Sequence, residues 1–169
     1  MNNLISICFC LALAFSLSLN TSAQSTEKKL DQAELMKQWI GTWEMEIGGD
    51  SVMVMKVTPH NNGIFFIQEE KVNGNVYNSW KGSTGLSADK NMIMGSALTS
   101  NGILFIDIGK FVEEDKFISD RYVGNTTHAA SQVMIKFSNE SLTARFKWRG
   151  EGMNWPDEWG PKMTFKKLD

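Results

Sequence analysis

The sequence predicts an all-β protein: an antiparallel up-and-down meander barrel of about ten strands, with one N-terminal helix that closes an end. Short runs rich in β-branched and aromatic residues fill the chain after Gly41, and turn residues separate them. Asn-Gly pairs at 62–63, 73–74 and 101–102 favour tight hairpins, because both central residues of such turns need a positive φ. No helical pattern separates the strands, and closure removes the exposed edges that an open sheet would leave.

Residues 1–23 have the features of a removable secretory signal peptide. This stretch contains no charged side chain, and it ends on the small residues Thr21-Ser22-Ala23. Its apolar run is shorter than the about 20 residues that a membrane-spanning helix needs. We expect cleavage before Gln24, which leaves residues 24–169 as a single domain, secreted or periplasmic, with no stable membrane insertion. The alternative is an uncleaved N-terminal anchor.

Composition excludes several classes of function for the mature chain. Cys8 and Cys10 both lie within the signal, so no disulfide, thiolate nucleophile or cysteine-ligated metal is available. A net charge of −2 argues against a nucleic-acid binder, which would need a basic face to meet phosphates. Neither His60 nor His128 belongs to a pattern of three or four convergent ligands, so we expect no metal and no cofactor. The mature chain has the size of one domain, and we expect a monomer.

The segment Glu27–Trp39 has the pattern of a helix. Its apolar residues recur at spacings of about three and four: Leu30, Ala33, Leu35, Met36 and Trp39. Ser25 or Thr26 is suited to the N-cap position, and Gly41 stops the helix. We expect this helix to lay its apolar face on one end of the barrel, in preference to binding a partner.

Ten runs after Gly41 are predicted strands. They are Thr42–Ile47, Val52–Thr58, Gly63–Val72, Asn75–Lys81, Asn91–Thr99, Ile103–Phe111, Lys116–Val123, Gln132–Phe137, Leu142–Arg149 and Lys162–Lys167. In several of them apolar and polar residues alternate, which indicates a wall with one dry and one wet side. Trp43 and Met45 share a face in the first strand, as do Phe146 and Trp148 in the ninth.

The segment Trp39-Ile40-Gly41-Thr42-Trp43 resembles the start of a lipocalin-type (calycin) barrel, where a short helix precedes a Gly-x-Trp motif that enters the first strand. It is similar in particular to uncharacterised lipocalin-like domains of exported bacterial proteins. The resemblance implies structural roles for Gly41 and Trp43, with an arginine of a late strand packed across the Trp43 indole. Arg145 or Arg149 would supply it, with Arg121 as a third candidate. The chain departs from typical lipocalins in lacking their disulfide and in having ten predicted strands, where eight are usual.

The resemblance also implies that the barrel holds a small apolar or amphipathic molecule. The residues predicted to bind it are Met45, Met55, Phe66, Met92, Met94, Phe105, Asp107, Phe117, Arg121, Phe146, Trp148 and Trp155. Methionine thioethers adapt to irregular apolar ligands. An inward Asp107 facing Arg121 would anchor a ligand headgroup, whereas the alternative places Asp107 at an exposed position. The same apolar residues could simply fill the barrel, so the sequence leaves a hollow and a filled interior open.

Two other functions stay open. A barrel enzyme, an isomerase or hydrolase, would use inward carboxylates among Asp107, Asp120 and Glu69. A filled-barrel interaction protein would present the tryptophan-rich segment 148–160 to a protein or glycan, although the same segment could fold back over the barrel end. The prediction preferred here is a binding protein without catalytic residues.

Overall fold

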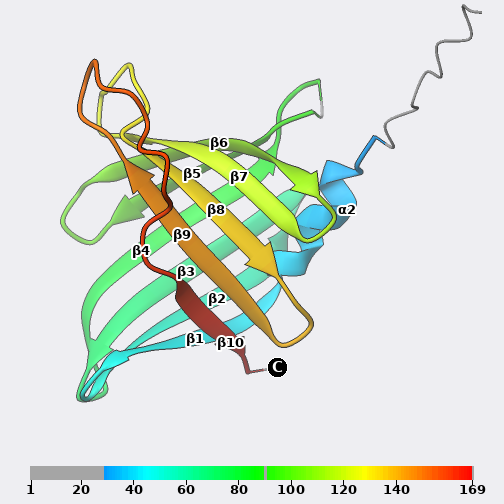
Figure 1. Cartoon of the computed structure of the whole chain (residues 1–169). Coiled ribbons are helices and arrows are strands. Elements are labelled where there is room, and N and C mark those ends of the chain that lie inside the picture. The colour runs from blue at the N-terminus through cyan, green and yellow to red at the C-terminus, as the bar shows by residue number, and fades with distance from the viewer. Residues whose placement is uncertain (1–28, 90, 169) are drawn as a thin grey trace, which may run out of the picture.

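The computed structural model describes residues 29–89 and 91–168, which form one closed, ten-stranded antiparallel barrel (Figure 1). The strands are β1 (Gly41–Gly48), β2 (Ser51–His60), β3 (Gly63–Val72), β4 (Asn75–Leu86), β5 (Ile93–Thr99), β6 (Leu104–Glu113), β7 (Lys116–Val123), β8 (Ser131–Phe137), β9 (Ser141–Trp148) and β10 (Met163–Lys167). Each strand pairs with its neighbours in sequence, and β10 pairs with β1 to close the ring. The predicted fold class is confirmed. The predicted signal peptide, residues 1–23, lies outside the described residues.

The hairpins explain why the meander has this order. In the β3–β4 turn, Asn73 and Gly74 have φ values of 51° and 76°. Both values are positive, as the tight turn that suits a twisted hairpin requires. Strands joined in this way pair with their neighbours in sequence. The pairing of β1 with β10 is the one between strands that are far apart in the sequence.

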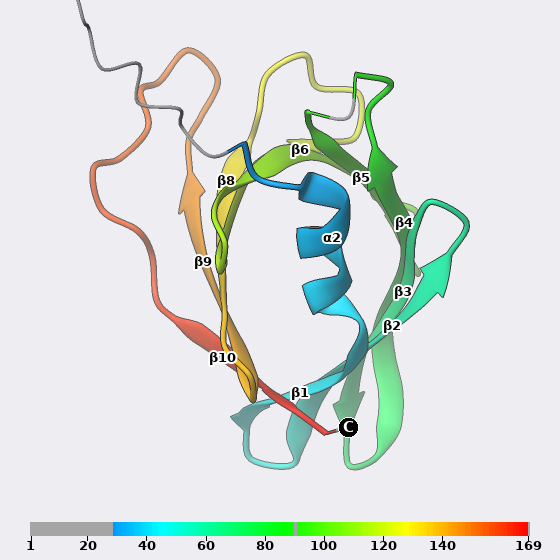
Figure 2. The same cartoon turned by 90° about the vertical axis from the view of Figure 1, so that its right-hand side faces the viewer.

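A short helix, α2 (Gln32–Met36), continues as the 3₁₀ turn η1 (Lys37–Trp39) and lies across one end of the barrel (Figure 2). Its N-cap is Asp31, whose Oδ1 accepts hydrogen bonds from the backbone nitrogens of Ala33 and Glu34 at 3.0 and 3.1 Å. The predicted helix over Glu27–Trp39 starts too early, because residues 29–31 are not helical, and Glu27 and Lys28 lie outside the described residues. Asp31 has an extended backbone and takes the capping role, so the helix begins at Gln32. The predicted caps Ser25 and Thr26 lie outside the described residues.

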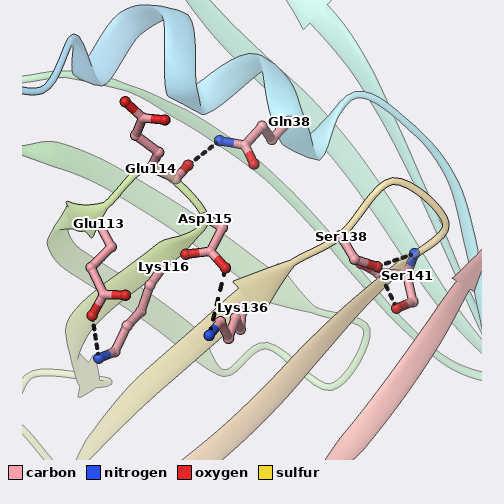
Figure 3. A network of polar contacts seen from close by, with 8 residues as sticks. All are labelled: Gln38, Glu113, Glu114, Asp115, Lys116, Lys136, Ser138 and Ser141. Atoms are coloured by element: carbon pink, nitrogen blue, oxygen red, sulfur yellow. Dashed lines mark hydrogen bonds and ion pairs between the residues drawn. The ribbon is translucent and has the colours of Figure 1, made fainter.

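Side-chain amides of this helical segment attach it to the end of the β6–β7 hairpin. Gln32 Nε2 donates to the carbonyl of Phe111 at 3.1 Å, and the Phe111 backbone nitrogen donates to Gln32 Oε1 at 2.7 Å. This pair is buried. Gln38 Nε2 donates to the carbonyl of Glu114 at 2.7 Å, within the polar network of Figure 3. The helix is therefore fixed to the barrel by directional bonds as well as by apolar packing.

The rest of that network lies at the surface beside the helix (Figure 3). Lys116 Nζ lies 2.8 Å from Glu113 Oε1, and this hydrogen bond lowers the pKa of the Glu113 carboxyl below its ordinary value. Lys136 Nζ lies 3.6 Å from Asp115 Oδ2. Because these groups are exposed, they organise the turn next to the helix more than they stabilise the fold.

Aromatic side chains fill the barrel end beneath the helix. The Trp39 ring meets Phe111, Phe117 and Phe137 edge-on, with centroid distances of 5.3, 4.8 and 5.2 Å. Trp43 is 1% exposed, and its Nε1 donates to the Trp39 carbonyl at 2.7 Å. The motif tryptophan is thus part of the core at the helix end.

The cation beside Trp43 is a lysine, which corrects the expected arginine. Lys167 Nζ lies 5.4 Å from the centre of the Trp43 ring, because the two residues are directly opposite in the β1–β10 register. Arg145 is exposed, since it follows the inward Ala144 and therefore points outward. Arg149 lies over the Trp155 indole, and Arg121 pairs with the Asp107 carboxylate.

Gly41 opens β1 with a φ of 137°, a backbone conformation that side-chain-bearing residues rarely adopt. A glycine is therefore needed at position 41 for the backbone to pass from the helical segment into the first strand. Within residues 29–89 and 91–168, no helix combines the length and apolar character needed to cross a membrane.

Candidate ligand-binding cavity

The barrel encloses a cavity of about 590 Å³. This volume falls in the range of about 300–1,000 Å³ that is usual for small-molecule sites. The aromatic plug fills only the helix end, so the interior is hollow beyond it. Of the two interiors that the sequence left open, the structure has the hollow one.

The cavity runs from the helix end to the opposite mouth of the barrel. Trp39, Phe117 and Phe165 line it at the helix end, where they belong to the buried core. Trp148 also lines it and is 61% exposed, so the cavity reaches the surface near the end of β9. Trp148 stacks on Phe146, with ring centroids 6.1 Å apart and planes at 17°.

Eight of the twelve residues predicted to bind a ligand line this cavity. They are Met55, Phe66, Phe105, Asp107, Phe117, Arg121, Phe146 and Trp148. Each is contributed by a strand, and together they come from β2, β3, β6, β7 and β9. Their part in binding a ligand stays a prediction.

The other four predicted residues lie elsewhere. Met45 packs against the buried core, and Met92 is half-buried just before β5. Met94 is 45% exposed on the outer side of β5, because the inward positions of that strand are taken by Ile93, Gly95 and Ala97. Trp155 is half-buried outside the cavity.

Several cavity residues were not singled out from the sequence. Small residues make the space: Gly95, Ala97, Ser119 and Ala144. Gln68, Trp80 and Thr84 add polar atoms to the cavity lining from β3 and β4. A stricter use of alternation could have found some of them, because Gln68 stands two residues after Phe66 and Ser119 two residues after Phe117.

Asp107 and Arg121 form a two-point ion pair inside the barrel. Arg121 Nε donates to Asp107 Oδ1 and Nη2 donates to Oδ2, both at 2.9 Å. The residues are opposite each other in the β6–β7 register, and their side chains are 28% and 27% exposed. Asp107 therefore faces the cavity, and the alternative of an exposed outward position is wrong.

Two aromatic rings flank the guanidinium of this pair. Arg121 Cζ lies 5.3 Å from the Phe105 ring centre and 5.7 Å from that of Phe146. Such contacts are favourable to the cation. Asp107 and Arg121 are the only ionisable residues among those that line the cavity in the described part of the chain. The cavity is therefore an apolar chamber with one charge-balanced polar position.

The carboxylates proposed for an enzyme do not converge. Asp120 accepts a hydrogen bond from Gln132 Nε2 at 3.0 Å, and Glu69 pairs with Lys71 at 3.0 Å. Neither lines the cavity, so Asp107 is the one carboxylate there within the described residues. In the described ranges, no group of three or more His, Cys, Asp or Glu residues is placed to hold a metal ion.

The tryptophan-rich connection between β9 and β10 folds back against β9. Arg149 Cζ lies 4.1 Å from the Trp155 ring centre, and Lys147 Nζ lies 5.0 Å from that of Trp159. Lys147 also donates to the Asp157 carbonyl at 2.8 Å. At the end of the loop, Gly160 lines the cavity, and its nitrogen donates to the Phe146 carbonyl at 2.9 Å. The two loop indoles are thus packed under cations, and only the last residues of the loop reach the cavity.

A scan against protein-family models finds no match for this chain, and a search of curated proteins finds no similar sequence. A closed antiparallel meander barrel with a helix at one end is consistent with the calycin fold.

Proposed function

We propose that this protein is an exported, lipocalin-like binding protein that holds one small apolar or amphipathic molecule inside its barrel. The observation that carries the proposal is the cavity of about 590 Å³, walled mainly by methionine, aromatic and aliphatic side chains. Burying apolar ligand surface contributes about 25 cal/mol per Å² before the costs of ordering the ligand. Such a chamber therefore favours a guest with an apolar body.

The methionines of β2 suit a guest of irregular shape. Met53 and Met55 line the same wall, and Gln68 Nε2 donates to Met53 Sδ at 2.9 Å. Unbranched thioether side chains change rotamer at low cost, so this wall can adapt to what is bound. Membership of the calycins and export to the periplasm or beyond are parts of the proposal that rest on the Gly-x-Trp motif and the N-terminal segment.

A fluorescence titration tests binding in the cavity. We expect an uncharged apolar probe, N-phenylnaphthylamine, to bind the purified protein saturably, with one probe per chain. Ala97→Phe places a ring into the cavity and should weaken binding by about tenfold or more. The matched control is Leu98→Phe, because Leu98 is the next residue of β5 and is 53% exposed on the outside.

Ala144→Phe repeats the test from the β9 wall, in case the first variant fails to fold. Equal probe affinity in the folded cavity variants and in Leu98→Phe would place the probe on the outer surface and overturn the proposal. Native mass spectrometry of protein purified from its own host adds a second test, in which a co-purifying small molecule supports the binding function.

A further inference from the structure

Resting on the proposed function, we infer that the natural ligand has an uncharged head that accepts hydrogen bonds, such as an ester, amide or hydroxyl group, and that this head binds Arg121 beside Asp107. The ion pair then selects against free carboxylates and amines that have the same apolar body. Three features of the cavity carry this inference.

The first feature is the charge balance of the pair. Both Asp107 oxygens accept from Arg121 at 2.9 Å, so the carboxylate and guanidinium neutralise each other. A ligand carboxylate at Arg121 would compete with Asp107 and leave one of two negative charges without a partner in an apolar chamber. A ligand ammonium at Asp107 would compete with Arg121 and leave one of two positive charges without a partner. A neutral head adds no net charge.

The second feature is the supply of free donors. A guanidinium has five N–H groups, and within the described residues the hydrogen bonds of Arg121 go to Asp107 through one Nε and one Nη2 donor. Three N–H groups therefore remain for a bound molecule. Because arginine accepts no hydrogen bonds, the ligand must supply the acceptor.

The third feature is the shape of the space around the guanidinium. The rings of Phe105 and Phe146 flank it, with centres 5.3 and 5.7 Å from Arg121 Cζ. Gly95 stands opposite Asp107 in the β5–β6 register and has no side chain. A Cβ at Gly95 would lie 2.6 Å from Thr84 Oγ1, so this side of the pair has no room for a larger residue. This crowding favours a small head over a bulky one, and the apolar lining of the cavity receives the body.

A displacement series tests the head without changing the body. Dodecanol, methyl dodecanoate, dodecanoic acid and dodecylamine compete at neutral pH against N-phenylnaphthylamine already bound to the purified protein. We expect the alcohol and the ester to displace the probe at concentrations about tenfold or more below those of the acid and the amine. Acid binding as tight as that of the alcohol would overturn the inference.

Charge variants of the pair should reverse the preference. Asp107→Asn keeps an oxygen that accepts from Arg121 but leaves a net positive charge, so the acid should gain about tenfold over the alcohol. Arg121→Gln leaves the carboxylate unpaired, so the amine should gain instead. Asp120→Asn is the matched control, because Asp120 bonds Gln132 and does not line the cavity. Its head preference should equal that of the unmodified protein.

The outcomes separate the inference from the function on which it rests. If the probe does not bind at all, the proposed binding function fails. If the probe binds but all four heads displace it equally, the neutral-head inference fails and the binding function stands. If a charge variant does not fold, as judged by circular dichroism, the series with the unmodified protein still decides.

Discussion

Gln32 shows how one side chain can define an end of the barrel. Its amide matches the backbone donor and acceptor of Phe111 at 2.7 and 3.1 Å, in a buried position. A hydrophobic residue would pack there equally well but would leave two backbone groups without partners. The polarity of Gln32 within an apolar helix face is thus structural, because a buried peptide group needs its hydrogen bonds.

We expect Gln32→Ala to lower the free energy of unfolding by about 2–4 kcal/mol, since it orphans both groups of Phe111. Urea denaturation followed by circular dichroism measures the loss. Gln38→Ala is the control, because the Gln38 amide makes one exposed hydrogen bond, to the Glu114 carbonyl. A loss in Gln32→Ala no larger than that in Gln38→Ala would contradict the structural role given to the buried pair.

For β5, the sequence does not show which side chains point into the barrel. The run from Met92 to Leu98 has apolar residues at both parities, so alternation alone gives no inward face. The structure points Ile93, Gly95 and Ala97 inward and leaves Met94 outside. Small residues face the cavity here because the Asp107–Arg121 pair and the aromatic rings already occupy the interior. The inward face of β5 is therefore decided by side chains of other strands of the closed barrel and not by the sequence of β5 itself.

Among the elements, β10 is the weakest part of the wall. It has five residues and two register pairs with β1, Trp43↔Lys167 and Glu44↔Lys166. The next residue, Leu168, adds one backbone hydrogen bond to the Thr42 carbonyl at 2.9 Å. Above these pairs, the loop packed on β9 takes the place of a longer strand. By contrast, β7 is paired with β6 and β8 along most of its length.

We therefore predict that amide hydrogens in β10 exchange with solvent earlier than those in β7, because they can open locally without disrupting the barrel. Native-state hydrogen exchange read by mass spectrometry compares peptides over Met163–Lys167 and Lys116–Val123. Equal protection of the two strands would mean that β1 and β10 open only when the whole domain unfolds.

The elements themselves were predictable from the sequence. Turn residues and short β-rich runs, which are local signals, predict all ten strands. The structure has a strand at each of these places. The cation at Trp43 was not predictable, because it depends on the register between β1 and β10. These are the first and last strands in the sequence, although they are neighbours in the barrel. The tryptophan-rich loop was ambiguous for a similar reason, since its packing depends on Lys147 in β9 and on Arg149 just after it.

At the scale of the whole molecule, the barrel combines a filled end with a hollow interior. Trp39, Trp43 and the phenylalanines around them give the domain a dense core without disulfides. The cavity beyond this core adds little to stability when empty, because its lining side chains lack partners on one side. Filling it should therefore stabilise the folded state.

We predict that a ligand at about 100 times its Kd raises the free energy of unfolding by about 2.7 kcal/mol, provided that it binds only the folded chain. For a domain of this size that corresponds to an increase in Tm of about 5–10 °C. Differential scanning calorimetry with and without dodecanol measures it. At the same dodecanol concentration, the tenfold weaker binding expected of Ala97→Phe should reduce the rise in Tm to about half or less, and an equal rise in that variant would contradict binding in the cavity.

The pairing of β1 with β10 also determines which part of the barrel forms last during synthesis. Hairpins such as β3–β4 can form as soon as their own residues are available, whereas the first strand must wait for the last. A nascent polypeptide held by a ribosome or a translocon cannot complete the ring before β10 emerges. In a chain exported as proposed through a translocon during its synthesis, the ring would close only after β10 has crossed the membrane, and the binding cavity would form on the far side.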